Sequence, residues 1–410
     1  MRQNYQIRDR QINTAPIQTE FIANHAILEP LKEKMTAVAR RIRTAVNEKQ
    51  RIVIKHHNDT DGFCSGLVLE QAIIPLIEAV NFKKQAVWEK FKRMPSVTPF
   101  LNIEDATKDI AQFLLVGQRF QEEKPLIILT DLGSGSENIL PLKMLKTFNC
   151  EIIVIDHHPV DPTVLELVDY HINPMEFDAP SSLCAGVLCC EVAKMIEKNV
   201  ERVELICAIS SYADHVETLY AQPYYDKANI PLEYLKQIGD VIDFTVFNLR
   251  NLDGKELLQV LLGSDEKKQR ELVQLLAKEL QVRKDKILTQ AHNLISEKET
   301  QAHRYIILPI SEISLRDMYP RLGKIVEIVH SHYGEKEKPL ITMGITSNSV
   351  TFRVEDGSQF NFQTMLEQLQ QKAPDAFIEG GGHPYAGTFR CQEAKFEAVF
   401  SLVKEYIESL

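Results

Sequence analysis

Three apolar stretches of the sequence end in side chains that can bind a metal ion, and one of them covers residues 151–155. This stretch is rich in β-branched residues and runs directly into Asp156, His157 and His158. Its composition is typical of a strand that is buried on both faces of a parallel sheet. Open α/β sheets bind ligands at the carboxyl ends of such strands, so the triplet stands where a functional site is expected. A solvated turn after a strand is the alternative interpretation.

The second stretch, residues 51–55, leads through His57, Asp59 and Asp61 into an apolar helix expected over residues 64–80. In a loop, the two aspartates can straddle a pair of ions. Helix-capping carboxylates are the alternative, which accounts for one aspartate but not for His57 as well. An EF-hand loop is disfavoured, because its later glycine and glutamate positions are not matched.

Asp131 follows the third stretch, residues 125–130, and Asp214 follows an apolar helical run near residue 208. Asp214 by itself can also be read as a capping residue. The complete set combines imidazole and carboxylate ligands without a thiolate: His57, Asp59, Asp61, Asp131, His157 and Asp214. Such ligands suit Mn²⁺ or Mg²⁺, and one bridging aspartate would allow two ions about 3.5–4 Å apart. Two-metal sites clamp the attacking and leaving oxygens of a phosphoryl displacement, so the set predicts hydrolysis of a phosphoester or phosphoanhydride.

Composition restricts the class of protein that carries these residues. The chain has 410 residues and a net charge of −10, which argues against a duplex binder that ignores sequence. A metalloenzyme acting on nucleic-acid ends stays open, because bound cations add local positive charge. No apolar run reaches the ~20 residues that span a bilayer, and the polar N-terminus lacks a signal peptide, so we expect no membrane partner. The seven cysteines form no C-x-x-C pair. Five of them lie in apolar contexts and are expected to be reduced core thiols of a cytoplasmic protein: Cys64, Cys184, Cys189, Cys190 and Cys207.

The elements that would position the candidate ligands divide the chain into three parts. We expect a parallel-sheet domain over 1–240, a leucine-rich helical linker over 241–300 and a smaller α/β domain over 301–410. Residues 1–50 are expected to be a helical lead-in, and residues 81–124 an insertion with its own helix. The segment 83–93 holds several basic residues and the only tryptophan, Trp88. It could follow and stack on a single nucleic-acid strand, or it could form an amphipathic helix with a solvated face.

The order of the motifs resembles the DHH phosphoesterase superfamily, which is named for its third motif. The matching segments are His-x-Asp-x-Asp-Gly at 57–62, Asp131, Asp-His-His at 156–158 and Asp214. A second signature, Gly-Gly-Gly-His at 380–383, resembles the substrate-binding motif of the DHH-associated C-terminal domain. Thr351, Phe352 and Arg353 resemble the arginine-bearing strand of that domain. The resemblance implies an α/β fold with a parallel-sheet DHH domain and a DHH-associated domain.

The resemblance also implies a role for each candidate residue. One ion would be held by His57, Asp59 and Asp131, and the other by Asp61, Asp131, His157 and Asp214. Asp131 would thus be catalytic as the shared ligand, and His158 would be catalytic by stabilising charge on the scissile phosphate. The C-terminal domain would bind substrate phosphate or a terminal nucleotide through Arg353, Gly381, Gly382 and His383.

The first motif departs from many relatives, which carry a histidine where this chain has Lys55. His56 and His57 are both candidates for the missing ligand. His57 is preferred, because archaeal RecJ-like proteins place a histidine at that position.

By this resemblance, the chain is expected to be a RecJ-like exonuclease that cleaves single-stranded DNA or RNA to mononucleotides with Mn²⁺ or Mg²⁺. Little sequence follows the Gly-Gly-Gly-His motif, so the OB-fold extension of bacterial RecJ is not expected. This favours an alternative, cleavage of short oligonucleotides, of a cyclic dinucleotide or of phosphoadenosine phosphate. The basic and aromatic segment 83–93 instead favours a longer strand. A scaffold in a replication complex is a third interpretation, and replication or repair proteins are conceivable partners.

Overall fold

The structure is a computed structural model that describes residues 17–81, 85–96, 98, 100–120, 124–177, 183–249, 252, 254–313, 319–334, 337–355 and 357–410, without the side chains of residues 116, 118–120 and 383. The chain divides into two compact units, Met1–Ala277 and Lys278–Leu410, and each unit is described by itself. The division falls inside helix α12 (Glu266–Leu294), which lies within the segment expected to be a helical linker.

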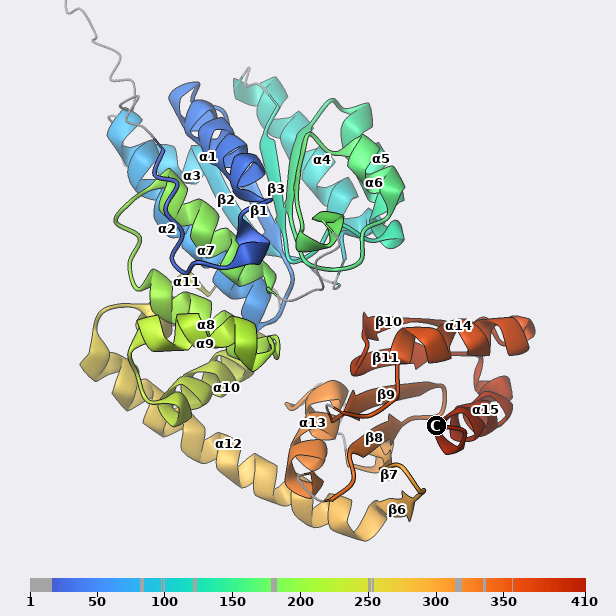
Figure 1. The fold of residues 1–410 in the computed structure, drawn as a ribbon. Helices are drawn as coiled ribbons and strands as arrows, with labels where there is room; N and C mark the ends of the chain where they lie inside the picture. The colour runs from blue at the N-terminus through green and yellow to red at the C-terminus, as the bar shows by residue number, and fades with distance from the viewer. Residues whose placement is uncertain are drawn as a thin grey trace, which may run out of the picture. The chain divides into compact units, whose positions relative to one another are not determined.

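A parallel sheet of five strands forms the centre of the first unit (Figure 1). Its order is β2-β1-β3-β4-β5, and the strands are β1 (Ile52–His56), β2 (Phe91–Pro95), β3 (Leu126–Thr130), β4 (Glu151–Ile155) and β5 (Tyr170–Ile172). Nearly every residue of the three middle strands is buried, as their continuously apolar sequences require. The predicted parallel α/β domain and its three candidate strands are therefore confirmed.

The register of these strands brings the chemically active loops to one edge of the sheet. His56 pairs with Thr130, and Thr130 pairs with Ile155, so the three strands end side by side. The backbone N–H of Asp131 donates to the carbonyl of Ile155 at 3.0 Å, which continues the ladder into the loop. His57, Asp131 and the triplet at 156–158 therefore leave the sheet at the same edge.

Helices cover both faces of this sheet (Figure 1). The helices of the unit are α1 (Lys32–Asn47), α2 (Thr60–Val80), α3 (Ala86–Lys90), α4 (Ile103–Phe120), α5 (Ile139–Thr147), α6 (Pro162–Leu167), α7 (Ala185–Ile196), α8 (Val203–Ala213), α9 (Thr218–Ala228), α10 (Leu232–Leu249) and α11 (Lys255–Leu262), with 3-10 turns η1 (Ala26–Leu28), η2 (Ser136–Asn138) and η3 (Pro174–Phe177). Helices α4, α5 and α6 share one hydrophobic core with β3 and β4. Helices α1, α2 and α7 pack together on the other face, and α8 packs on both α2 and α7.

The expectation that residues 81–124 are an insertion is wrong for its central part. Residues 91–95 form β2, which pairs in parallel with β1 along its whole length. The short helix α3 precedes this strand, so residues 86–93 are not one continuous amphipathic helix. Single-residue patterns do not reveal a short edge strand of mixed polarity, because alternation over five residues is also compatible with a helical turn.

Helix α2 is the long core helix of the first unit. By length and composition alone, Thr60–Val80 is apolar enough to cross a membrane, but 72% of its apolar window is buried inside the structure. It packs against α7 and α8, and this burial accounts for its apolar sequence.

The second unit is built on a mixed sheet of six strands in the order β10-β11-β9-β8-β7-β6. The strands are β6 (Ser296–Glu299), β7 (Arg304–Pro309), β8 (Leu340–Ile345), β9 (Ser349–Val354), β10 (Glu379–His383) and β11 (Ala386–Arg390). Only the β7–β8 pair is parallel among the described strands of this sheet. The helices are α13 (Leu322–Tyr333), α14 (Phe362–Lys372) and α15 (Phe396–Glu408), with 3-10 turns η4 (Ile310–Glu312), η5 (Pro374–Ala376) and η6 (Glu393–Lys395).

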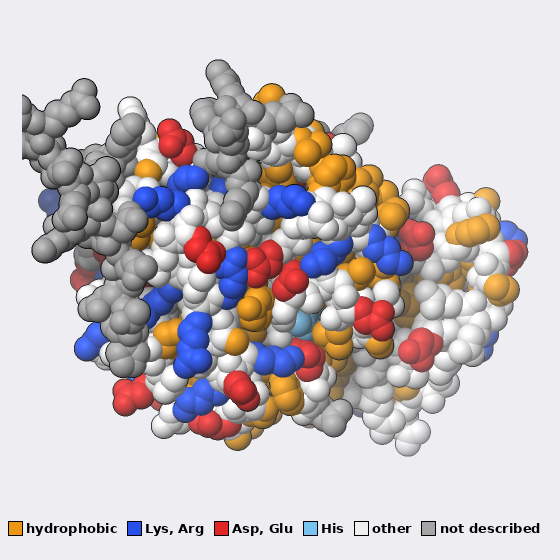
Figure 2. Space-filling model, turned by 90° about the horizontal axis from the view of Figure 1, so that it is seen from above, with side chains coloured by type: hydrophobic (Ala, Val, Ile, Leu, Met, Phe, Trp, Pro, Cys, Tyr) orange, Lys and Arg blue, Asp and Glu red, His pale blue; other side chains and the backbone are white. Residues whose placement is uncertain are grey.

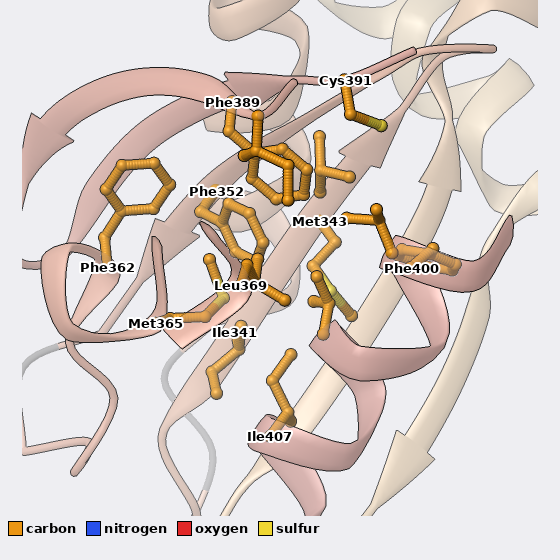
Figure 3. Packing of buried hydrophobic residues seen from close by; sticks show 14 of the residues in the cluster. Ile341, Met343, Phe352, Phe362, Met365, Leu369, Phe389, Cys391, Phe400 and Ile407 are labelled. Carbon is orange, nitrogen blue, oxygen red and sulfur yellow. The ribbon is translucent and has the colours of Figure 1, made fainter. Parts of the chain in front are cut away.

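Aromatic packing stabilises this second sheet. Figure 3 shows Phe352 of β9 between Phe389 of β11 and the side chains of α14, with Phe400 and Ile407 of α15 beneath the sheet. The ring centroids of Phe352 and Phe389 lie 6.1 Å apart in a stacked arrangement. The predicted compact α/β module in the C-terminal part is therefore confirmed.

Candidate metal centre

The loop between β1 and α2 places His57 beside two carboxylates. Asp59 caps α2, because its Oδ1 accepts a hydrogen bond of 2.9 Å from the N–H of Gly62. Its other oxygen lies 2.8 Å from Nδ1 of His57, and that nitrogen lies 3.3 Å from Oδ2 of Asp131. The capping role of Asp59 is therefore confirmed for one oxygen, and it does not exclude metal binding by the other oxygen, which faces the histidine.

His56 points away from this cluster. Its Nε2 lies 3.1 Å from Nη1 of Arg93, and its Nδ1 lies 2.7 Å from the carbonyl oxygen of His57. Burial, together with the charge of Arg93, holds the pKa of His56 well below its usual value. Of the two candidate histidines, the geometry therefore places only His57 among the carboxylates.

Lys55, which stands at the position of the histidine in other first motifs, also lies outside the cluster. Its Nζ is buried and forms ion pairs with Asp109 at 2.7 Å and Asp105 at 3.2 Å, both in α4. This residue ties the sheet to α4 and offers nothing to an ion at the loop edge.

Asp131 lies between the two histidine-bearing loops. Its Oδ2 faces His57, and its Oδ1 lies 3.4 Å from Nε2 of His157. Its backbone has φ 57°, in the left-handed region that few residues other than glycine adopt. Its Oδ2 is buried and accepts no hydrogen bond of good geometry from the described residues. A buried carboxylate oxygen without a partner costs free energy. A cation is a suitable partner here, because the neighbouring imidazole nitrogens and carboxylates can bind it as well.

Asp156 forms hydrogen bonds with the other two residues of the triplet. It accepts hydrogen bonds from the N–H of Ser134 at 3.0 Å and of His157 at 2.8 Å, and its Oδ1 lies 2.8 Å from Nδ1 of His158. Burial would raise the pKa of Asp156, but the charges and hydrogen bonds of its partners lower it. Its role in orienting His158 was missed by sequence reasoning, although its place in the triplet was the available signal. The His158 side chain is 37% exposed, so a substrate can reach it.

Asp61 and Asp214 border the cluster without joining its tightest groups. Asp61 accepts hydrogen bonds from the N–H of Gly186 at 3.1 Å and from the hydroxyl of Ser210. Asp214 lies at the end of α8, with Oδ2 3.6 Å from Nδ1 of His157. Two sets of donor atoms lie within 4.8 Å of one another: His57, Asp59 and Asp131 in one, and Asp131, Asp156, His157 and His158 in the other. Asp131 belongs to both, so the described residues offer two adjacent metal-binding groups with one shared carboxylate.

The carboxylates of the cluster create a strongly negative electrostatic field, which contributes to the pKa shifts of Asp61 and His157. Burial raises the pKa of Asp61 well above its usual value, and the charges of Asp131 and Asp214 add to this. Burial alone would lower the pKa of His157, but Asp214, Asp131 and Asp61 raise it to about 10. The same carboxylates raise the pKa of a buried histidine and attract divalent cations, so the donor set fits a metal ion.

The C-terminal candidates lie in the second unit, on neighbouring strands. Arg353 is on β9, opposite Ala386 of β11, and Gly381 and Gly382 are on β10, which pairs with β11. Burial lowers the pKa of Arg353, and its buried Nε has no hydrogen-bond partner among the described residues. The backbone of His383 belongs to β10, while its side chain lies outside the described residues.

Among its described residues, the basic and aromatic segment does not form a continuous track for a nucleic-acid strand. Arg93 is 5% exposed and its Nε pairs with Glu70 at 2.6 Å, while Phe91 is also buried. Trp88 is 81% exposed, and Lys83 and Lys84 lie outside the described residues. On the face seen in Figure 2, basic and acidic side chains are interspersed among the coloured residues.

Comparison with known proteins identifies the family of the first unit. Residues 51–216 match the N-terminal domain of the DHH family. An uncharacterized protein of Methanocaldococcus jannaschii is 34% identical over 426 residues, which include 95% of this chain and 56% of that protein. The chain therefore spans little more than half the length of this curated relative.

Solved structures resemble the chain over most of its length. One that is described as the DHH domain of a member of the s1p family of ribosomal proteins is 32% identical, with a TM-score of 0.92, 96% of this chain covered and 95% of the other. RecJ of Thermus thermophilus in complex with Mn²⁺ is 14% identical, with a TM-score of 0.61, 92% of this chain covered and 55% of RecJ. An exonuclease RecJ bound to manganese is 15% identical, with a TM-score of 0.57 and coverages of 91% and 94%. At these identities the likeness to RecJ concerns the fold.

Proposed function

Because this chain belongs to the DHH family, whose members are metal-dependent phosphoesterases, we propose that it is a Mn²⁺- or Mg²⁺-dependent exonuclease that releases mononucleotides from single-stranded DNA or RNA. The observation that carries the proposal is that Asp131 belongs to two adjacent donor groups, the second of which includes the accessible ring of His158. A bridging carboxylate between two ions is the arrangement used for displacement at phosphorus.

The ligands are proposed to divide as the resemblance implies. His57, Asp59 and Asp131 would hold one ion, and Asp131, Asp61 and His157 would hold the other with Asp214. Asp61 can serve although it accepts two hydrogen bonds, because two carboxylate oxygens offer about four lone-pair sites. Two bound ions would supply an activated water molecule and neutralise charge on the phosphate.

His158 would act on the substrate rather than on an ion. Its Nδ1 is taken by Asp156, so Nε2 is the nitrogen that can donate to a phosphate oxygen. Burial opposes protonation of His158, but the charge of Asp156 raises its pKa, which favours a ring that carries protons on both nitrogens. A donor held in this way stabilises the charge that develops in the transition state. Arg353 and the glycines of β10 would bind the phosphate or terminal nucleotide of the substrate.

Cleavage of short oligonucleotides or small nucleotides is the second candidate. The burial of Phe91 and Arg93 favours it, because these residues are not available to stack on or follow a long strand. The description of a similar structure as a ribosomal protein supports the inclusion of RNA substrates. A scaffold role beside catalysis, with replication or repair proteins as partners, is the third candidate.

We also propose a reducing compartment such as the cytoplasm. All seven cysteines are buried and free, which is the state that a reducing environment maintains.

The decisive experiment is hydrolysis of end-labelled single strands of about five and about forty nucleotides, as DNA and as RNA, with Mn²⁺. Asp131→Ala should abolish the activity, while the matched change of an exposed carboxylate, Glu104→Ala, should leave it intact. Degradation of both lengths supports the exonuclease, and degradation of the short strand alone supports the second candidate. If no strand or small nucleotide is cleaved by the wild type, the hydrolase proposal fails.

A further inference from the structure

A chain of hydrogen bonds leads from helix α1 to the backbone of His158 and uses none of the residues that the sequence singled out as ligands. Lys34 of α1 donates to Oε2 of Glu176 at 2.6 Å. The other oxygen of Glu176 lies 2.9 Å from Nδ1 of His171, whose Nε2 lies 3.1 Å from Oγ of Ser134. Asn173 then donates from Nδ2 to Oγ of Ser134 at 3.1 Å and to the carbonyl oxygen of His158 at 2.9 Å.

The donors and acceptors in this chain can be assigned from its charged end. Glu176 is held as a carboxylate, because the hydrogen bonds of His171 and Lys34 outweigh its burial and lower its pKa. Nδ1 of His171 is therefore the donor to Glu176, which leaves Nε2 to accept from the hydroxyl of Ser134. The hydroxyl oxygen can then accept from Asn173.

Both N–H groups and the oxygen of the Asn173 amide have hydrogen-bond partners. Its two N–H bonds go to Ser134 and to the His158 carbonyl, and its Oδ1 accepts from the N–H of Met175 at 2.9 Å. Asn173 and Ser134 are 0% exposed. In such surroundings the loss of one partner leaves another polar group unsatisfied, so the arrangement has a single low-energy state.

Ser134, His171 and Glu176 have the hydrogen-bond order of a hydrolytic Ser-His-acid triad, but they do not form a second active site. The serine is completely buried and its oxygen already accepts from Asn173, so no substrate can approach it. What the three residues do is fix the orientation of the Asn173 amide.

Ser134 also joins the two supports of His158. Its N–H donates to Oδ2 of Asp156, whose Oδ1 lies beside Nδ1 of the His158 ring. Its Oγ bonds to Asn173, which holds the His158 carbonyl. Ser134 therefore supports both the ring of His158, through Asp156, and its backbone carbonyl, through Asn173.

From this geometry we propose that Asn173 is a positioning residue that holds His158 in its reactive place, and that Ser134 and His171 orient Asn173. The proposal rests on the proposed function, in which His158 stabilises charge on the scissile phosphate. It adds a mechanism by which residues that bind neither an ion nor the substrate control the rate.

The test of coupling is a double-mutant cycle with the full chain, Mn²⁺ and the cleaved strand as substrate. Asn173→Ala is expected to lower kcat about 10–100-fold, as loss of outer support does at metal sites, with KM changed less than about twofold. In the His158→Ala background the same change should cost almost nothing, because Asn173 acts through His158. If the two losses multiply, Asn173 acts independently and the proposal is overturned.

Asn138→Ala is the matched control, because Asn138 is a buried asparagine of the same unit whose bonds go to Leu101 and Gly135. It should lower stability without the selective loss of kcat.

Imidazole rescue tests the histidine link. A cavity of about 320 Å³ borders His171, Glu176 and Lys34, so a small molecule can take the place of a deleted ring. Added imidazole is expected to restore kcat of His171→Ala at least severalfold and to leave the Asn173→Ala protein unchanged. Equal response of both variants, or of neither, would contradict the order of the chain.

Hydrogen exchange gives a readout that does not depend on activity. In Asn173→Ala, the amides of His157 and His158 should exchange about tenfold faster, while those of strand β4 keep their wild-type rates. Unchanged exchange at the triplet overturns the positioning role. If the wild type cleaves no substrate but the triplet loosens as expected, the proposed function fails and the positioning of His158 stands.

Discussion

At Asp131, three costly features meet in one residue. The backbone is in the left-handed region, the side chain is 2% exposed, and one carboxylate oxygen accepts no hydrogen bond of good geometry from the described residues. Strain and unsatisfied groups of this kind persist when the surroundings enforce them, and they gather at functional sites. A cation bound between the two histidine-bearing loops would compensate for the unsatisfied oxygen.

Glu191 of α7 is another buried carboxylate, but it stabilises the fold and lies outside the metal-binding groups. Its oxygens accept from the N–H of Ile22 at 2.7 Å and from the hydroxyl of Tyr224 at 3.3 Å, which anchors the segment before α1. Burial raises the pKa of Glu191 from 4.5 to about 7. Glu191 is therefore one residue outside the metal-binding groups that should make the stability of the metal-free protein depend on pH near neutrality.

The direction of this pH dependence follows from the linkage between proton binding and folding. A carboxyl group whose pKa is raised on folding stabilises the protein below its unfolded pKa, and this contribution is lost as the pH rises through the folded value. Between about pH 5.5 and 8.5, Glu191 should account for a loss of about 2 kcal/mol in the free energy of unfolding. Urea unfolding with EDTA across this range measures it.

Glu191→Gln should remove this part of the pH dependence, whereas Glu166→Gln, on the exposed side of α6, should leave it unchanged. A Glu191→Gln protein with the full wild-type slope would show that the titrating group lies elsewhere.

At the scale of elements, the close packing of α2, α7 and α8 sets the place of Asp61. The first turn of α7 approaches α2 so closely that Gly186 donates its N–H to Asp61, and Ser210 of α8 donates its hydroxyl to the same carboxylate. A Cβ on Gly186 would lie 2.7 Å from Oδ1 of Asp61 and would overlap Oγ of Ser210. Glycine is required there by the approach of the helices.

Gly186→Ala should therefore displace Asp61 and weaken Mn²⁺ binding about tenfold or more, with a loss of about 1–3 kcal/mol in stability from overpacking. Calorimetric titration with Mn²⁺ and denaturant unfolding measure the two effects. Gly344→Ala is the control, because its Cβ would crowd Val326 and Ile310 in the second unit, far along the chain from any candidate ligand. It should lower stability and leave Mn²⁺ affinity unchanged; equal affinity in both variants would remove Asp61 from the set of ligands.

At the scale of the whole molecule, the metal-binding groups lie in one unit and the proposed phosphate-binding strand in the other. Two neighbouring glycines of that strand differ in what they are needed for, one for folding and the other for substrate binding. A Cβ on Gly381 would meet nothing within 4 Å, whereas Gly382 has φ 146° and its Cβ would lie 2.3 Å from the carbonyl oxygen of Ala386. Gly382 is needed by the β10–β11 hairpin, and Gly381 has open space that a substrate backbone can use.

Gly381→Ala should keep wild-type stability within about 0.5 kcal/mol and raise KM, because the added methyl group occupies the proposed phosphate site. Gly382→Ala should lose stability through its strained backbone. Thermal unfolding and steady-state kinetics on the cleaved strand measure both variants. An unchanged KM for Gly381→Ala would exclude a contact between this glycine and the substrate.

The local sequence was sufficient for the elements whose pattern is strong. Continuous β-branched runs predicted β1, β3 and β4, and the apolar run after Asp61 predicted α2, because burial on all sides imposes a composition that neighbouring residues alone reveal. The succession of polar residues after these strands was enough to identify the family, since the carboxyl ends of parallel strands meet at one edge.

Only the tertiary structure decided between partners that are equivalent in the sequence. His56 and His57 are adjacent, yet His56 contacts the buried Arg93 whereas His57 faces Asp131. Arg93 itself was read as part of a surface track, but it lies in β2, which pairs with β1 at the edge of the sheet, and its buried side chain pairs with Glu70. Asn173 carried no signal at all, since its contact with His158 exists only when β5 lies beside β4. Periodicity records which residues are buried, whereas the choice of a hydrogen-bond partner depends on which distant segments packing brings within about 3 Å.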